Sequence, residues 1–216
     1  MEELLLSLFA LDLVLLPGES LPLHIFEERY KTMIAECLAA GTGSNGLEEF
    51  GVVRVKEQGI ASVGCTAQVV RVTRRYRNGR FDILTRGERR FEILFTDDEK
   101  PYLRAGVAFF EDDQGFNRPA EQEAHRALEL LEQITRKMSQ AGSTISILPP
   151  YRHLSFQIAG LLPLDLDFKQ SLLAARSEKE RLREVINAMQ SILPQLERAA
   201  NARKKADGNG NLWPHR

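Results

Sequence analysis

Short apolar runs separated by turn residues fill the first half of the chain, and this pattern predicts β-strands. Residues 13–30 predict a short apolar strand, a turn at Pro17-Gly18, a second short strand and then directly a helix. The apolar residues of that helix recur at helical spacing from Phe26 to Leu38. Further strands are predicted at 50–55, 60–76, 91–95 and 102–110. A glycine inside the longest of them, Gly64, indicates a β-bulge.

Asn78-Gly79 is the strongest short hairpin signal in the sequence, because both positions tolerate positive φ. A two-residue turn there would place Tyr76 opposite Phe81 and Arg75 opposite Asp82. The first pair is aromatic and the second has opposite charges, so both favour this pairing.

Apolar residues in the second half recur every three or four positions, which predicts helices. Helices are predicted at 119–138 and 151–162, with a loop at 139–150 between them. Asp165 can cap a third helix. Ser177 and Glu180 form a capping box for a fourth, which Pro194 should kink or end.

These patterns divide the chain into three parts. A β-rich subdomain is predicted at 1–115 and a helical subdomain at 116–198. From about residue 199 the sequence turns polar and rich in glycine and asparagine, so 199–216 is predicted to be a disordered tail. The expected fold class is therefore α+β.

Positive and negative charges nearly balance over the whole chain, but they are unevenly distributed along it. The 216 residues are 43% apolar and 27% charged, and the net charge of -1 indicates neither nucleic acid nor an anionic membrane as a partner. Residues 71–90, however, hold eight arginines against two acidic residues, a net charge of +6. We call this segment the arginine hairpin. Its arginines are Arg71, Arg74, Arg75, Arg77, Arg80, Arg86, Arg89 and Arg90.

Motifs that would carry catalysis are absent from the sequence. There is no Gly-Lys dipeptide, and hence no Walker A loop, and no G-x-S-x-G, H-E-x-x-H, C-x-x-C or S-x-x-K. Residues 41–46 match G-x-G-x-x-G, but a predicted helix precedes them and a strand follows, the reverse of a dinucleotide site. Four scattered histidines and two cysteines have no metal-ligand spacing. We predict no catalytic residue, no metal, no cofactor and no enzymatic activity.

The start of the sequence favours a cytoplasmic location. Met1-Glu2-Glu3 is acidic where a secretory signal would be basic. The apolar stretch 4–16 is interrupted by polar residues and is too short to span a bilayer.

The arginine hairpin has two interpretations. Its arginines could contact phosphates or acidic groups, with aromatic residues beside them for stacking. Alternatively, the hairpin is a solvated surface whose arginines pair with neighbouring acids and discourage edge-to-edge sheet pairing. If the first interpretation holds, the candidate binding residues are Arg74, Tyr76, Arg77, Arg80 and Phe81.

An ordered set of short motifs runs along the chain from about Phe9 to Leu196. In the first half the motifs are FEERY at 26–30, FGVV at 50–53, NGRF at 78–81 and GERRFEI at 87–93. In the second half they are IAGLLP at 158–163, KQSLL at 169–173 and ERL at 180–182. With these motifs in this order, the sequence resembles the N-terminal, substrate-binding domain of Lon proteases and of stand-alone Lon-domain proteins.

This resemblance implies a PUA-like pseudo-β-barrel followed by a helical bundle. It also implies a region that engages substrates and helps assembly, while separate domains of Lon proteases hydrolyse ATP and cut peptides. The 216 residues hold neither a Walker loop nor room for a Ser-Lys peptidase domain. A label such as S16 peptidase would therefore describe ancestry and not activity.

Two functions are expected on this basis. The first is a non-catalytic, ATP-independent module that binds unfolded or degron-bearing polypeptide, or a protease or chaperone partner. Its expected surface is an apolar groove between the β subdomain and the helices, with arginines at the rim that select acidic residues. The alternative is RNA binding through the barrel and the arginine hairpin, with a steeply salt-dependent affinity.

Overall fold

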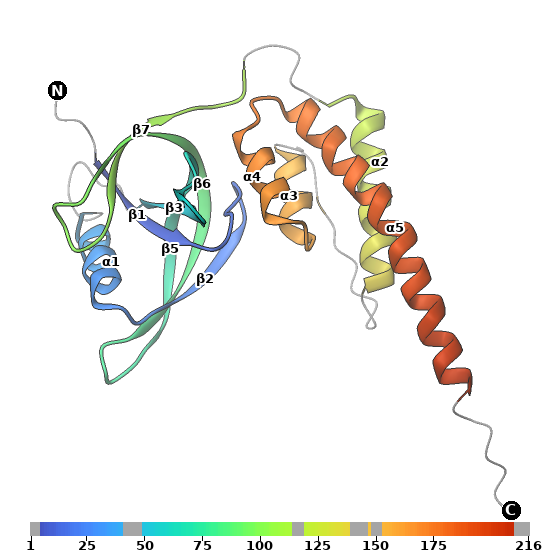
Figure 1. Ribbon diagram of the computed structural model, residues 1–216, viewed down its shortest axis with the longest axis horizontal. Helices are drawn as coiled ribbons and strands as arrows, with labels where there is room; N and C mark the ends of the chain where they lie inside the picture. Colours follow the sequence, from blue (N-terminus) through green and yellow to red (C-terminus); the bar gives the residue numbers. More distant parts are fainter. Residues whose placement is uncertain (1–4, 41–48, 114–118, 139–146, 148–152, 210–216) are drawn as a thin grey trace, which may run out of the picture. The chain divides into compact units, whose positions relative to one another are not determined.

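The computed structural model describes residues 5–40, 49–113, 119–138, 147 and 153–209. The elements before the second half of the chain are β1 (Leu5–Leu11), β2 (Ser20–Ile25), α1 (Glu28–Ala40), β3 (Glu49–Lys56), β4 (Gly59–Ile60), β5 (Val63–Arg75), β6 (Phe81–Asp97) and β7 (Arg104–Phe109) (Figure 1). The helices that follow are α2 (Glu121–Met138), α3 (Leu154–Leu161), α4 (Leu166–Ala174) and α5 (Glu178–Asn209). A mainly antiparallel sheet followed by helices confirms the predicted α+β class.

The sheet closes on itself. Its strand order is β1-β7-β6-β5-β3, and β3 returns to pair with β1 in parallel, from Leu8 opposite Gly51 to Leu11 opposite Arg54. The other pairings are antiparallel. This closure produces the predicted pseudo-β-barrel, to which β2 is added along β6 and β4 along β3.

The barrel interior explains Gly64, for which a bulge was predicted. Gly64 is paired in register with Phe91, whose ring is fully buried. A Cβ at Gly64 would lie 2.5 Å from that ring, and a Cβ at Gly51 would lie 2.7 Å from it. The bulge prediction is wrong in position, since the register shift lies one step further along, between Cys65 and Ala67. Both glycines make room for a core phenylalanine.

The N-terminal strand is also displaced from its predicted place. β1 occupies Leu5–Leu11, whereas residues 14–16 are buried without belonging to a strand. The turn predicted at Pro17-Gly18 is present, with Gly18 at φ +82°, and the strand and helix expected after it are β2 and α1. An apolar run in the sequence indicates burial, but it does not tell a buried strand from a buried segment that pairs with no strand.

β6 is long enough to serve two neighbours in succession on the same side. Its first part, residues 81–86, pairs with β2, and residues 91–97 pair with β7. On the other side β5 accompanies β6 from Val63 to Arg75. As a result β5, β6 and β2 form a three-stranded ribbon that ends at the β5–β6 turn (Figure 1).

The turn of this ribbon is not the predicted two-residue type. The Tyr76 amide donates to the Arg80 carbonyl at 2.9 Å, and the Gly79 amide donates to the Tyr76 carbonyl at 3.1 Å. Gly79 has φ +78°, whereas Asn78 is not in the left-handed region. This is a three-residue loop closed by a left-handed glycine, the next commonest hairpin connection.

The different turn shifts the strand register by one residue. Arg74 now lies opposite Asp82, and Arg75 lies opposite Phe81. The predicted pairs of Arg75 with Asp82 and of Tyr76 with Phe81 are therefore wrong. Because successive side chains point to opposite faces, the shift also changes which arginines share a face with Asp82.

The chain divides into two compact units, and the division differs from the predicted subdomains at 1–115 and 116–198. The first unit holds residues 1–113 together with 159–176, and the second holds 114–158 and 177–216. The segment 159–176 belongs with the barrel because α4 packs on β5. The side-chain amide of Gln170, for example, donates to the Val63 carbonyl at 3.0 Å.

In the second unit α2 packs against α5. Buried apolar residues repeat at helical spacing along both helices and include Ala124, Ala127, Leu131 and Ile134 of α2 and Leu182, Val185, Ile186 and Met189 of α5. The predicted cap is present in the capping box, where the Glu180 amide donates to the Ser177 hydroxyl at 3.3 Å. In the first unit, Asp165 caps α4 as predicted.

α5 continues through Pro194 to Asn209, so of the two outcomes expected at Pro194 the end of the helix is wrong and the kink stays a prediction. The predicted tail at 199–216 begins as helix, because its first residues, AANARKKA, are mostly strong helix formers. Residues 210–216, and most of the loop predicted at 139–150, lie outside the described residues. Among the described helices none combines the length and the apolar character needed to cross a membrane.

Candidate functional site

The ribbon of β5, β6 and β2 brings the arginine hairpin next to a strand far away in sequence. In the register, His24 of β2 lies opposite Asp82 of β6, which lies opposite Arg74 of β5. Two residues further along β6, Pro22, Leu84 and Arg71 form a second row across the same strands. Since the two rows lie two positions apart on β6, their side chains share one face. We call this the hairpin face.

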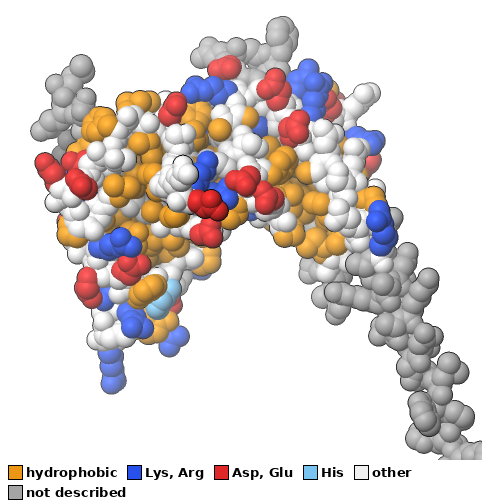
Figure 2. Space-filling view, in the orientation of Figure 1, with side chains coloured by type: hydrophobic (Ala, Val, Ile, Leu, Met, Phe, Trp, Pro, Cys, Tyr) orange, Lys and Arg blue, Asp and Glu red, His pale blue; other side chains and the backbone are white. Residues whose placement is uncertain are grey.

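The hairpin face is the exposed side of the ribbon. Pro22, His24 and Arg71 are exposed, whereas Ile83, which lies between the rows, and Ile25, which lies beyond the first row, are buried. Figure 2 shows basic side chains gathered at the lower end of the barrel unit, where Figure 1 draws the β5–β6 turn.

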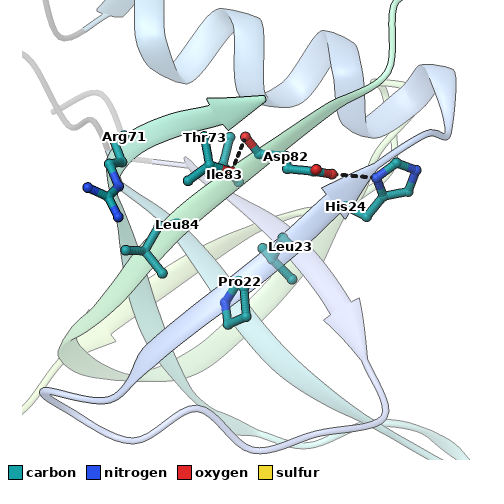
Figure 3. A pocket seen from close by; sticks show the side chains of 8 residues that line it. All are labelled: Pro22, Leu23, His24, Arg71, Thr73, Asp82, Ile83 and Leu84. Atoms are coloured by element: carbon teal, nitrogen blue, oxygen red, sulfur yellow. Dashed lines mark hydrogen bonds and ion pairs between the residues drawn. The ribbon is translucent and has the colours of Figure 1, made fainter. Parts of the chain in front are cut away.

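An open pocket of about 400 Å³ lies on the hairpin face (Figure 3). It is lined by Pro22, Leu23, His24, Arg71, Thr73, Asp82, Ile83 and Leu84. Arg71 stands at one end and the His24–Asp82 pair at the other, with Leu84, Pro22 and Leu23 between them. The pocket is thus apolar in its middle and charged at both ends. It lies on β2, β5 and β6 of the first unit, and the groove expected between the β subdomain and the helices stays a prediction.

A network of hydrogen bonds fixes the Asp82 end of the pocket. His24 Nδ1 lies 2.5 Å from Asp82 Oδ1, and the Tyr76 hydroxyl donates to Asp82 Oδ2 at 2.8 Å. These bonds hold the pKa of Asp82 below its usual range. The bond with His24 has the larger effect and the bond from Tyr76 the smaller one. The bond to Asp82 correspondingly raises the pKa of Tyr76. Both carboxylate oxygens of Asp82 are therefore engaged, one with His24 of β2 and the other with Tyr76.

Aromatic contacts complete the same network. The Arg74 guanidinium lies 4.7 Å from the centroid of the Tyr76 ring, and the His24 ring meets Tyr76 edge-on at 5.6 Å. Phe26, which is 54% exposed, also stacks on His24, with the ring centroids 5.9 Å apart. Tyr76 is therefore held from two directions and offers little open ring surface for a stacked base.

Three of the eight arginines have acidic partners. Arg86 lies 3.8 Å from Glu88, Arg89 lies 3.1 Å from Glu49, and the buried Arg90 lies 2.5 Å from Asp112.

The situation is different toward the turn. Within the part of the chain that the structure describes, Arg71, Arg75, Arg77 and Arg80 form no ion pair. The interpretation of the hairpin as a surface of mutually paired charges therefore fits only its barrel end.

The five predicted binding residues separate into three groups. Arg74 and Tyr76 belong to the Asp82 network on the hairpin face. Arg77 and Arg80 are exposed at the turn. Phe81 is half-buried on the opposite side, where it pairs with Ile25 and Arg75.

The sequence interpretation missed the residues that β2 brings to the site, His24 and Pro22, and it did not single out Arg71. The signal that could have found them is the length of β6. A strand of 17 residues exceeds the 13 of β5 and needs further partners.

The sequence profile of the ATP-dependent protease La (LON) substrate-binding domain matches residues 6–191. The chain belongs to this family. It is 26% identical to the Lon protease of Flavobacterium johnsoniae over 213 residues, which cover 91% of this chain and 25% of that protein. The chain thus spans about a quarter of the length of this curated relative.

Two solved structures of Lon N-terminal domains have a similar fold. One is the Lon N-terminal domain protein from Xanthomonas campestris, with a TM-score of 0.64 and 25% identity over 85% of this chain and 98% of that one. The other is the N-terminal domain of the Mycobacterium avium complex Lon protease, with a TM-score of 0.62 and 19% identity over 86% and 98% of the two chains. The second likeness concerns the fold alone.

Proposed function

We propose that this Lon-family chain is a non-catalytic module that binds polypeptide segments on the hairpin face. The observation that carries the proposal is a pocket with an apolar middle beside arginines that lack acidic partners. Apolar surface supplies affinity for unfolded segments, and unpaired arginines favour segments that carry acidic residues. The family name, which refers to substrate binding, is consistent with this role.

The ribbon favours one mode of binding over another. β2 pairs only with β6 among the described strands, so its outer edge could in principle accept an added strand. Pro22 in the middle of β2 has no amide hydrogen to offer, and proline at an edge opposes strand addition. A bound polypeptide should therefore lie across the hairpin face and use side-chain contacts.

Several features support a non-catalytic role. The His24–Asp82 pair has two of the three members of a triad-like arrangement, but the only hydroxyl lining the pocket, that of Thr73, donates to the Asp82 carbonyl at 3.2 Å. Burial raises the pKa of the Cys37 thiol to about 11 and raises that of Cys65 as well, so neither favours the thiolate form. These features support a binding role over a catalytic one.

The proposal is tested by reversing charge at the turn. Arg77→Glu with Arg80→Glu should weaken binding of a fluorescein-labelled acidic unfolded polypeptide about tenfold, because two attractive rim charges become repulsive. Fluorescence anisotropy without ATP measures the affinity, and mass spectrometry should recover the polypeptide intact.

The matched control is Arg126→Glu with Arg198→Glu, which makes the same charge change at exposed positions of the second unit. Equal weakening by both pairs, or cleavage of the polypeptide, would contradict the proposal. Tight binding of a structured RNA with a steep salt dependence would favour the nucleic-acid alternative instead.

A further inference from the structure

We infer that the pocket on the hairpin face is a specificity site for an acidic side chain that lies two positions from an aliphatic one, with Arg71 binding the carboxylate. This inference rests on the proposed polypeptide binding and names the class of segment that it would select.

The charges of the pocket point to a carboxylate. Its one acidic residue, Asp82, is bound by His24 and Tyr76 at one end, and its one arginine, Arg71, stands at the other end. Arg71 has no ion-pair partner within the described residues. A guanidinium presents parallel donors that match both oxygens of a carboxylate, which a lone ammonium group does not.

The apolar middle of the pocket points to an aliphatic neighbour. Leu84 and Pro22 follow Arg71 in the same row across the three strands, and both keep part of their surface open to solvent. Val70, which is 54% exposed, adds apolar surface in the bulge beside Arg71. The pocket volume of about 400 Å³ falls within the range of small-ligand sites. It is thus large enough to admit side chains of a polypeptide.

The spacing of an extended polypeptide matches this row. Side chains two positions apart point to the same side and lie roughly 6.5 Å apart, while neighbouring strands lie about 4.8 Å apart. An acidic residue held by Arg71 therefore places the residue two positions away over Leu84 and Pro22. The selected pattern is acidic-x-aliphatic.

The test uses four fluorescein-labelled peptides in a glycine-serine background and the intact chain. The first carries Glu-Ser-Leu units, and the others replace Glu by Gln, Glu by Lys, or Leu by Ala. Because a charge-assisted hydrogen-bonded pair is lost, the Gln peptide should bind about tenfold more weakly. The Ala peptide should also bind more weakly than the Glu-Ser-Leu peptide.

Two substitutions test whether Arg71 determines the preference for an acidic side chain. Arg71→Glu should abolish the preference for the Glu peptide and favour the Lys peptide, because the charges of the pair are exchanged. Arg71→Lys should keep the preference but reduce it, since the ammonium group lacks the fork geometry. Circular dichroism is used to check that these variants, which change an exposed residue, keep the fold.

Arg75→Glu is the matched control. Arg75 lies in the same hairpin and has no ion-pair partner among the described residues, but it faces the other side, opposite Phe81. It should lower the affinity for all acidic peptides slightly and leave the ratio of Glu to Gln affinities unchanged. A loss of that ratio in Arg75→Glu, or its retention in Arg71→Glu, would overturn the inference.

The inference and the proposed function fail in different ways. If the unsubstituted chain binds the Glu, Gln and Lys peptides equally, the specificity site is wrong while polypeptide binding stands. If no peptide binds, both are wrong.

Discussion

Asp82 organises the tip of the ribbon through bonds to two other strand segments. His24 reaches it from β2, and Tyr76 reaches it from the end of β5. Arg74 then lies over the Tyr76 ring. A single carboxylate therefore aligns three strands and leaves the arginines of the turn without an acidic partner from the hairpin.

The pKa of Asp82 determines how the ribbon tip responds to acid. Because the pKa is lower in the folded chain than in the unfolded one, the contribution of Asp82 to stability is present above the unfolded pKa of about 3.9. That contribution is lost as the pH falls through the folded value. We expect the Tyr76 ring signals in an NMR titration to keep their folded positions at pH 4 and to change only in more acidic solution.

Asp82→Asn should remove this acid transition and loosen the tip already at neutral pH, since the amide cannot accept both bonds as a charged group. Asp98→Asn, at an exposed turn position, is the control and should leave the Tyr76 titration unchanged. An identical acid transition in Asp82→Asn would show that another group controls it.

The residue scale is also where prediction from sequence ends. The Asn78-Gly79 signal correctly indicates a hairpin, but the choice between a two-residue and a three-residue loop depends on how β5 and β6 twist in the barrel. Two further register shifts, after Val69 and after Val72, decide that Arg71 reaches the pocket. Each shift moves the side chains that follow it to the opposite face of the strand. The number of arginines in the hairpin was therefore predictable, whereas the set of residues that line the pocket was not.

At the scale of elements, local signals succeeded where they are chemically specific. The cap at Asp165 and the cap at Ser177 follow from side-chain hydrogen bonding to free amides, which requires no tertiary information. Pro194 failed as a stop signal because a helix of 32 residues can lose one backbone hydrogen bond and continue. Sequence signals such as capping residues therefore predict where a helix begins better than a proline predicts where a long helix ends.

A buried polar network joins α3 to α5 in the second unit. Ser155 donates from its amide and its hydroxyl to the two carboxylate oxygens of Glu178, at 2.9 and 2.6 Å. Arg181 donates to Glu178 at 2.8 Å and to the Ser155 hydroxyl at 3.2 Å, and it covers the Phe156 ring at 4.3 Å. Arg181 is only 1% exposed. Removing it would leave a buried carboxylate without its counter-charge.

Arg181→Ala should therefore destabilise the second unit by about 3–5 kcal/mol. Urea unfolding followed by circular dichroism at 222 nm measures the change. Arg183→Ala is the matched control two residues away, because it removes an exposed ion pair with Glu123 and should cost about 0–1 kcal/mol. Similar losses in both variants would mean that burial of the network adds nothing.

At the scale of the whole chain, the main departure from the sequence prediction is the return of 159–176 to the barrel. Several side chains make this connection, among them those of Arg54, Gln170 and Arg90. Arg54 lies 2.6 Å from Asp167, Gln170 donates to β5, and Arg90 donates to the carbonyls of Leu173 and Ala175 at 3.3 and 2.5 Å. Contacts between residues more than 80 positions apart have no local signature, so a sequential division was the natural expectation.

The barrel should accordingly depend on this returning segment. A chain of residues 1–113 alone lacks Asp167, the partner of Arg54, and the carbonyls of Leu173 and Ala175 that Arg90 binds, whereas a chain in which a flexible Gly/Ser linker joins 113 to 159–176 restores them. The Asp113 amide donates to the Arg176 carbonyl at 2.9 Å, so the two ends of the first unit meet without the second. We expect the linked chain to unfold cooperatively in urea and to exceed 1–113 in stability by about 3 kcal/mol or more. In 1–113 the buried Arg90 keeps Asp112 but loses the carbonyls of Leu173 and Ala175, and hydrogen bonds to a charged group contribute about 1.5–3 kcal/mol each.

A linked chain that carries 159–176 in scrambled order is the control for added length, and it should be no more stable than 1–113. Hydrogen exchange of the β5 amides gives a local measure, because α4 packs on that strand. Slow exchange at Val63–Ala67 in 1–113, equal to that in the linked chain, would show that the barrel is complete without the segment. The expected pattern is rapid exchange in 1–113 and slow exchange only in the correctly ordered linked chain, because the Gln170 amide and the Arg90 guanidinium connect α4 to the strands only when the segment is intact.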